Sequence, residues 1–172
     1  CLSGPKRDPE VVKLGQQRAE VHLEFSTQIY RGQVESGRFF FHGHPGPAGW
    51  WDEPCTNKLL EADGVSRVRA DQCQYGQQVR YGPLVCQPVK KPTGLMRNAP
   101  RLLESLMKRC QGRDGQCSRP AGGKHVQASG RVASDAARYP AGLCRAIIHG
   151  MVAEMKGRGI YRPGEVGLHA GR

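Results

Sequence analysis

Two groups of cysteine and histidine residues could hold a metal ion or exchange protons. Cys110, Cys117 and His125 lie in the second half of the chain, with six and seven residues between them. Structural zinc modules usually carry their ligands in tighter pairs, so this spacing favours an irregular loop over a zinc site. His42 and His44 alternate in a Pro- and Gly-rich run with no Cys or carboxylate at a suitable spacing, which favours polar loop histidines. We therefore expect no metal site.

Other residues could act on protons or phosphates. Asp71 follows a predicted strand and could be catalytic, but Asp is also a common turn former, and the turn is favoured. Four glycines in the second half could cradle a phosphate: Gly112, Gly115, Gly122 and Gly123. No predicted strand leads into them and no helix opens directly behind them, so the fingerprint of a phosphate-binding loop is missing.

The cysteine pattern and the hydropathy pattern indicate an intracellular location, nuclear or cytoplasmic. The chain has seven cysteines, an odd number without the spacing of a small disulfide framework, which favours reduced thiols. The first ten residues are polar and begin without Met, so the chain looks cut from a longer one and shows no secretory leader. No apolar run approaches the roughly 20 residues of a membrane-spanning helix.

The excess of positive charge favours a polyanionic partner. Lys and Arg total 26 against 15 Asp and Glu, which gives a formal net charge of +11. Each phosphate that a cation neutralises releases a condensed counterion, so nucleic acid, most plausibly DNA, is the expected partner. Two basic clusters supply the predicted phosphate contacts, which are Lys90, Lys91, Arg97, Lys124 and Arg131.

A long N-terminal helix is the clearest predicted element. Asp8 can cap free amides, Pro9 suits the first helical position, and Gly37 can end the helix after about residue 35. Five apolar residues recur at helical spacing and predict one buried stripe: Val11, Leu14, Val21, Phe25 and Ile29.

The apolar run at residues 39–41 indicates a strand covered on both faces. A helix followed by such a strand is typical of parallel α/β layering. The run at residues 42–49 is too rich in Pro and Gly to continue the strand, so it is predicted as a loop at the strand's carboxyl end, where ligands bind in open α/β sheets.

The remaining elements complete one predicted α/β domain over residues 1–156. We expect helices at residues 56–62, 100–109 and 140–156, a strand at 65–70, a hairpin pairing 78–81 with 85–91, and an irregular basic loop at 111–130. Residues 157–172, rich in Gly, are predicted to be a disordered tail.

Several segments together resemble a known type of sequence. They are residues 37–45 with Trp50 and Trp51, residues 71–76, residues 90–93, and Tyr139-Pro140 with Leu143-Cys144. In this order they resemble a region of copia-type retroelement polyproteins, which in turn resembles the later half of cytosine-5 DNA methyltransferases. The resemblance implies a partial doubly wound, Rossmann-like sheet that binds S-adenosylmethionine, with flanking helices and long basic loops.

The chain departs from the methyltransferase pattern at the reactive positions. Gly43 stands where the acidic residue would fall, Cys1 lacks the preceding Pro of the nucleophile, and no Gly-rich cofactor loop follows a strand. We therefore expect no cofactor and no methyl transfer by this chain alone, but a nucleic-acid-binding fragment or remnant. Two alternatives stay open: a methyltransferase or nuclease completed by upstream sequence, and a scaffold module that uses Trp50 and Trp51 as interface anchors.

Overall fold

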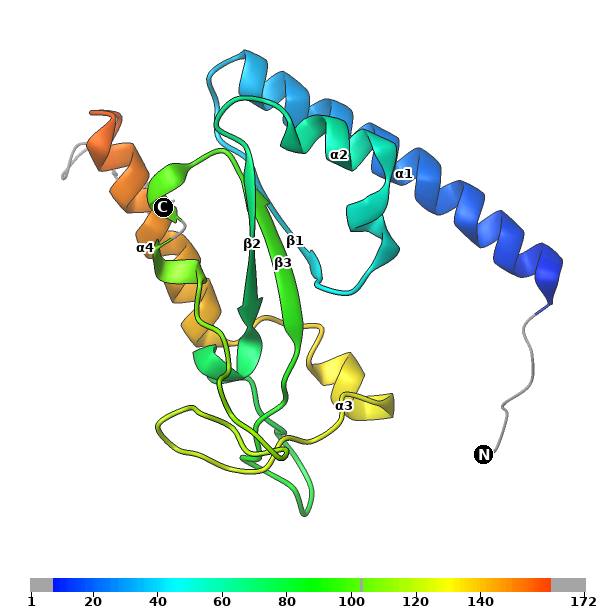
Figure 1. Ribbon diagram of the computed structural model, residues 1–172, viewed down its shortest axis with the longest axis vertical. Coiled ribbons are helices and arrows are strands. Elements are labelled where there is room, and N and C mark those ends of the chain that lie inside the picture. Colours follow the sequence, from blue (N-terminus) through cyan, green and yellow to red (C-terminus); the bar gives the residue numbers. More distant parts are fainter. Residues whose placement is uncertain (1–7, 103, 162–172) are drawn as a thin grey trace, which may run out of the picture.

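A three-stranded antiparallel sheet forms the centre of the protein, with helices on both of its faces (Figure 1). The computed structural model describes residues 8–102 and 104–161. The helices are α1 (Pro9–Glu35), α2 (Pro54–Leu60), α3 (Gly130–Asp135) and α4 (Ala141–Gly157), and the strands are β1 (Phe41–Pro45), β2 (Ser66–Asp71) and β3 (Pro92–Arg97). Short 3-10 turns lie at η1 (Gly49–Asp52), η2 (Gln72–Tyr75), η3 (Pro100–Leu102) and η4 (Glu104–Leu106).

The sheet topology contradicts the predicted parallel, doubly wound fold. The strand order is β1-β3-β2, and β3 pairs antiparallel with both neighbours, so that Phe41 and Ser66 each lie opposite Arg97. Residues 42–45, which we predicted as a loop, belong to β1, because ladder hydrogen bonds to β3 hold even this Gly- and Pro-containing segment extended. β1 is an edge strand, where a terminal Pro is tolerated.

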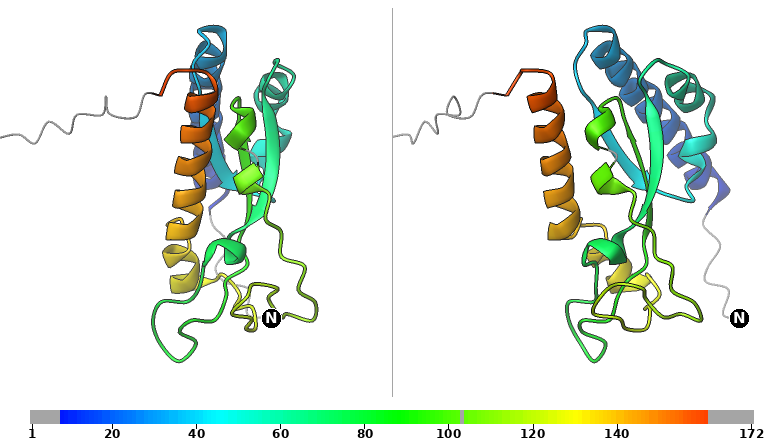
Figure 2. Two further views of the ribbon diagram at one scale, coloured as in Figure 1. Left: turned by 90° about the vertical axis from the view of Figure 1, so that its left-hand side faces the viewer. Right: turned by 60° about the vertical axis from the view of Figure 1, so that its left-hand side comes forward.

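Two hydrophobic cores lie on opposite faces of the sheet, one under α4 and the other under α1 and α2 (Figures 1 and 2). Successive side chains of β3 serve the two cores, since Leu95 packs with Leu143 of α4 while Met96 packs on the other face. The phenylalanine run follows the same alternation: Phe39 and Phe41 contact the α4 core and Phe40 the other. The predicted burial on both faces is therefore confirmed, but only Phe41 of the run belongs to a strand, and the predicted strand direction is wrong.

Helix α1 begins and ends as its sequence predicts. The side chain of Asp8 accepts a hydrogen bond from the backbone amide of Glu10 at 2.9 Å, and Pro9 occupies the first turn. Gly37, just after the helix, has a φ of 68°, a conformation that glycine adopts without steric cost.

The buried face of α1 is not the predicted one. All five residues of the predicted stripe are exposed, Val21 and Phe25 to 68% and 60%. The face that packs on the protein carries Leu23 and Thr27, followed by Tyr30 and Val34 against the α1/α2 core. Apolar spacing alone indicated a helix with one apolar face, but the tertiary contacts select a different face.

The other predicted elements hold to different degrees. The helices near residues 56–62 and 140–156 and the strand near 65–70 are confirmed as α2, α4 and β2. The predicted helix at residues 100–109 is wrong: the segment forms only the turns η3 and η4, which still bury Leu102 and Leu106. The predicted hairpin forms in part: Gln78 and Pro88 make an isolated antiparallel bridge, and the amide of Val79 donates to the carbonyl of Gln87 at 2.9 Å. Of the predicted tail, residues 162–172 lie outside the described residues.

One end of the protein is built mainly of loops. In Figure 1 the segments around residues 76–91 and 107–129 gather with α3 at the lower end, beyond β2 and β3. The apolar cluster there is small, with Val79, Val89 and Ala136 buried and Val126 and Val132 packed against them. Something other than a large apolar core must therefore fix these loops.

The close packing of Trp51 on Gly94 gives a test of the sheet. A Cβ at Gly94 would lie 2.5 Å from the Trp51 ring, whereas a Cβ at Gly49 would meet nothing within 4 Å. We predict that Gly94→Ala lowers the free energy of unfolding by about 1 to 3 kcal/mol, because β3 or Trp51 must shift. Denaturant titration of both variants checks this. Equal stability of Gly94→Ala and the control Gly49→Ala would contradict the packing.

Candidate metal centre

Three cysteines and one histidine from distant parts of the sequence meet at the loop-built end. They are Cys73, Cys110, Cys117 and His125, and their ligand atoms all lie within 4.8 Å of one another. The three cysteines are buried and the histidine is partly buried. Cys73 belongs to η2, immediately after β2, while the other three lie in the long loop that follows η4. The sheet thus supplies one corner of the cluster and the loop supplies the others.

Asp71 holds the start of the loop beside Cys73. Its buried carboxylate accepts hydrogen bonds from the Arg109 side chain at 3.0 Å and from the backbone amide of Cys110 at 2.9 Å. Its own backbone amide donates to the carbonyl of Lys108 at 3.0 Å. The role of Asp71 in the structure is therefore to position Cys110, which differs from both the turn and the catalytic role considered from the sequence.

The loop then folds back on itself and brings Cys117 close to His125. The amide of Cys117 donates to the carbonyl of Gly123 at 2.8 Å, and the amide of His125 donates to the carbonyl of Gly115 at 2.7 Å. Gly115 and Gly123 adopt φ values of 77° and 99°. The loop glycines thus make the turns that bring the ligands together, a use that the sequence analysis did not consider.

Hydrogen bonds within the cluster favour a thiolate at Cys110. Its sulfur lies 3.6 Å from Nε2 of His125 and 3.9 Å from the sulfur of Cys117, and the Ser118 hydroxyl donates to it at 3.6 Å. Burial raises the pKa of Cys110, but hydrogen bonds from Ser118 and from the backbone of Gly112 outweigh it and lower this pKa to about 6. For Cys73, burial and the neighbouring Cys117 raise the pKa to about 12.

The donor set matches a structural zinc site. Three cysteine sulfurs, which lose their protons when they bind a metal, and one imidazole are soft and borderline ligands of the kind that bind zinc in Cys3His sites, and four protein ligands fill a tetrahedral shell. The sequence disfavoured zinc because Cys110, Cys117 and His125 gave three ligands without a tight pair. The missing ligand is Cys73, whose position after a strand was predicted but whose distance from the loop was not visible in the sequence.

The predicted phosphate contacts fall into three groups. Lys90, Lys124 and Arg131 are exposed at the loop-built end. Lys91 is partly buried, its ammonium donates to the carbonyl of Ala136 at 2.7 Å, and burial lowers its pKa. Arg97 is only 2% exposed, at the opposite end of β3, so little of its side chain is accessible to a phosphate, and its contact stays a prediction.

The histidines and tryptophans around β1 pack with one another. His42 stacks on Trp50 with ring centroids 4.2 Å apart, and its Nδ1 lies 2.9 Å from the Tyr30 hydroxyl. Burial, with a smaller effect of His44, lowers the pKa of His42 to about 4, so the ring is neutral at pH 7. Trp51 is buried beneath Arg67, whose guanidinium lies 3.8 Å from the ring centroid, so Trp51 is not an exposed anchor.

Gly43 has a steric explanation in this fold. A Cβ at this position would overlap the hydroxyl of Tyr139, which packs against β1. The residue thus accommodates an aromatic neighbour, and the antiparallel sheet removes the structural basis on which an acidic methyltransferase residue was expected here.

Comparison of the chain with protein-family models, with curated proteins and with solved structures found no match. The resemblance to copia-type polyproteins therefore stays a prediction. Within the described residues, no helix combines the length and the apolar character needed to cross a membrane.

The contacts of Asp71 give a test of how much the stability of the cysteine cluster depends on its attachment to β2. Replacing Asp71 with Ala leaves the buried amide of Cys110 without its acceptor, which costs about 1 to 3 kcal/mol. We expect a lower melting temperature for Asp71→Ala and a smaller loss for Arg109→Ala, because Arg109 is partly exposed. Thermal unfolding followed by circular dichroism measures both. A larger loss in Arg109→Ala would show that the ion pair, not the Cys110 amide, dominates.

Proposed function

We propose that this chain is a nucleic-acid-binding module whose binding surface is organised by a structural zinc ion. The convergence of Cys73, Cys110, Cys117 and His125 carries the proposal, because the loop that supplies three of these ligands is also strongly basic. From Lys108 to Arg131 the sequence has six Lys and Arg residues and one acidic residue, Asp114. A metal ion that holds this loop in one conformation also holds its basic residues in place on the surface.

A structural role for zinc agrees better with the site than a catalytic one. Catalytic zinc keeps a position open for water or substrate, whereas four protein donors occupy the shell here. The cysteines are also buried, and Gln74 covers the cluster by donating to the sulfurs of Cys73 and Cys117 at 3.7 and 3.6 Å. The metal would contribute folding energy and not a reactive water.

The charges around this loop are available to a polyanion. Among the residues with a described structure, Lys90, Arg113, Lys124 and Arg131 form no ion pair with a carboxylate, and all four are exposed. Such cations favour phosphate binding through counterion release without any base contact. The copia-type resemblance, itself a prediction, points to the same class of partner.

Metal binding is the first prediction of this proposal. The purified chain should contain one zinc ion, and Co²⁺ in its place should give the visible absorption of a tetrahedral thiolate site. Cys73→Ser should weaken zinc binding at least tenfold, because one of four ligands is lost, while Cys144→Ser, at an exposed cysteine outside the cluster, should not. A competition titration with a chromogenic chelator measures both. A metal-free chain with a Cys110–Cys117 disulfide would contradict the proposal.

The second prediction concerns nucleic acid. The zinc-loaded chain should bind DNA with an affinity that falls as salt rises, with a log–log slope of about −1 for each phosphate contact. The double variant Lys90→Ala/Lys124→Ala should reduce this slope by about two units, whereas Arg97→Ala, at a buried position, should leave the slope unchanged even if it lowers stability. Fluorescence anisotropy over a range of salt concentrations measures the slope. A slope near zero would refute nucleic-acid binding.

A further inference from the structure

A cavity lies between the loop at residues 78–82 and helix α3, close to the basic loop. Its volume is about 270 Å³, slightly below the range of roughly 300 to 1,000 Å³ usual for small-molecule sites. Such a volume suits one ring system better than an extended ligand. The lining combines one aromatic ring, two arginines and one carboxylate, from Tyr81, Arg80, Arg131 and Asp135.

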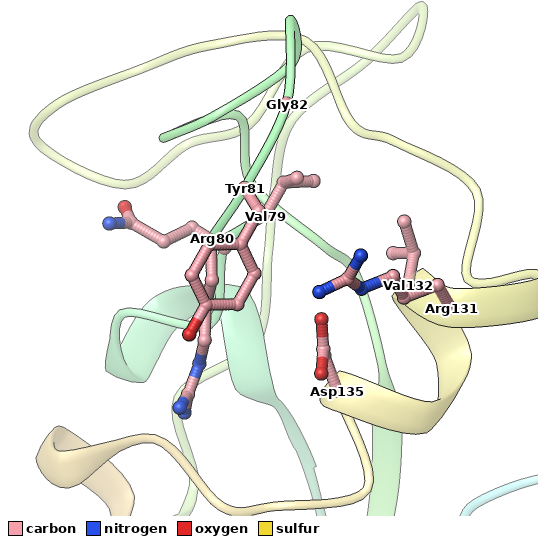
Figure 3. Close-up of a pocket in the computed structure, with 8 residues that line it drawn as sticks. Val79, Arg80, Tyr81, Gly82, Arg131, Val132 and Asp135 are labelled. Carbon is pink, nitrogen blue, oxygen red and sulfur yellow. The ribbon is translucent and has the colours of Figure 1, made fainter.

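The charged groups of α3 face the tyrosine ring across this cavity. Figure 3 shows the Tyr81 ring on one side and the Arg131 guanidinium with the Asp135 carboxylate on the other. The guanidinium carbon of Arg131 lies 5.3 Å from the ring centroid of Tyr81. Asp135 stands one helical turn after Arg131 and points toward its guanidinium. A planar N–H donor group therefore lies over an aromatic face and toward a carboxylate.

We propose that this cavity binds an unpaired guanine base. The atoms N1, C2, N2 and N3 of guanine form a planar guanidine fragment whose N1–H and N2–H are adjacent donors, like those of the Arg131 side chain. A carboxylate only accepts hydrogen bonds, so Asp135 can take two from the N1–H and N2–H of guanine but one at most from adenine, cytosine or thymine. Tyr81, which is 63% exposed, supplies the face on which the base stacks.

The base takes the place of the Arg131 side chain. A base held between two planes needs about twice the 3.5 Å contact distance, more than the 5.3 Å that separates Tyr81 from Arg131. Arg131 is exposed, so its guanidinium can move out at little cost and pair with the phosphate of the same nucleotide. Among the described residues, the Asp135 carboxylate forms an ion pair with Arg138, at 3.6 Å and itself largely exposed, so it can turn to the base.

This inference rests on the proposed function and narrows it to single strands. In a duplex the N1–H and N2–H edge of guanine is paired with cytosine and is not accessible to Asp135 without base extraction, which costs a few kcal/mol. A strand with an unpaired guanine therefore binds at both the basic loop and the cavity, whereas an oligothymidine binds through its phosphates alone.

The test compares labelled twelve-nucleotide strands by fluorescence anisotropy, with the zinc-loaded full chain at low salt. A thymidine strand with one central guanosine should bind about tenfold tighter than the all-thymidine strand, the discrimination of a bidentate contact. A strand with inosine, which lacks the N2 amino group, should fall between them. Asp135→Asn and Tyr81→Ala should abolish the preference, and Tyr81→Phe should keep it, because the ring face is retained.

Two controls separate this inference from the function on which it rests. Leu84→Ala changes an exposed residue of the neighbouring loop and should leave every affinity unchanged. Arg131→Ala should reduce the salt slope by about one unit and keep the guanosine preference. Equal affinity of the wild-type chain for the two strands, with a normal salt slope, would overturn the guanine site and leave the proposed function standing. Loss of binding to every strand would overturn both.

Discussion

The convergence of three sulfur atoms and one imidazole is the constraint on which the loop-built end depends. Apolar packing there is limited to Val79, Val89, Ala136 and two partly buried valines, and the cluster around the sulfurs consists of the three cysteines themselves. A few buried valines contribute about 1.5 to 3 kcal/mol each at most, whereas structural zinc contributes about 10 to 16 kcal/mol in small zinc modules. The proposed metal ligation would thus be large enough to offset the entropy of ordering a loop so rich in glycine.

Contacts at the end of β2 fix the start of this loop against the sheet. Besides Asp71, the hydroxyl of Tyr75 donates to the carbonyl of Ser105 at 3.0 Å and accepts from the amide of Lys108 at 3.1 Å. The carbonyl of Tyr75 lies against Gly142 of α4, where a Cβ would overlap it. The segment that carries Cys73 is therefore fixed by β2, by α4 and by the chain that leads to Cys110. These contacts therefore fix the positions of the first two ligands, Cys73 and Cys110.

Signals within a few residues of one another predicted individual helices and strands. Contacts between residues far apart in the sequence decided the strand pairing and the metal centre, which the sequence did not show. The cap at Asp8 and the stop at Gly37 fix α1 because they act within a few residues. The phenylalanine run correctly indicated burial on two faces, but burial does not depend on strand direction, which the pairing of Phe41 with Arg97 sets across more than fifty residues. The same limit applied to the metal centre. Three ligands lie within one loop, and the fourth, Cys73, becomes a neighbour only after β2 and β3 have paired.

Net charge is a property of the composition, and the fold decides where the charge acts. At the end of α4, the buried carboxylate of Glu154 accepts hydrogen bonds from the side chain of Arg158 and the backbone amide of Arg101, each at 2.9 Å, so two arginines there share one acidic partner. At the opposite end the buried carboxylate of Asp71 is engaged with Arg109 and with the backbone amide of Cys110. Among the described cations at this end, Lys90, Arg113, Lys124 and Arg131 are exposed and form no ion pair with a carboxylate. A positive potential concentrated there, beside a cavity with an aromatic ring, favours a polyanion with bases over a featureless one, because charge supplies the affinity and the ring and carboxylate supply the selectivity.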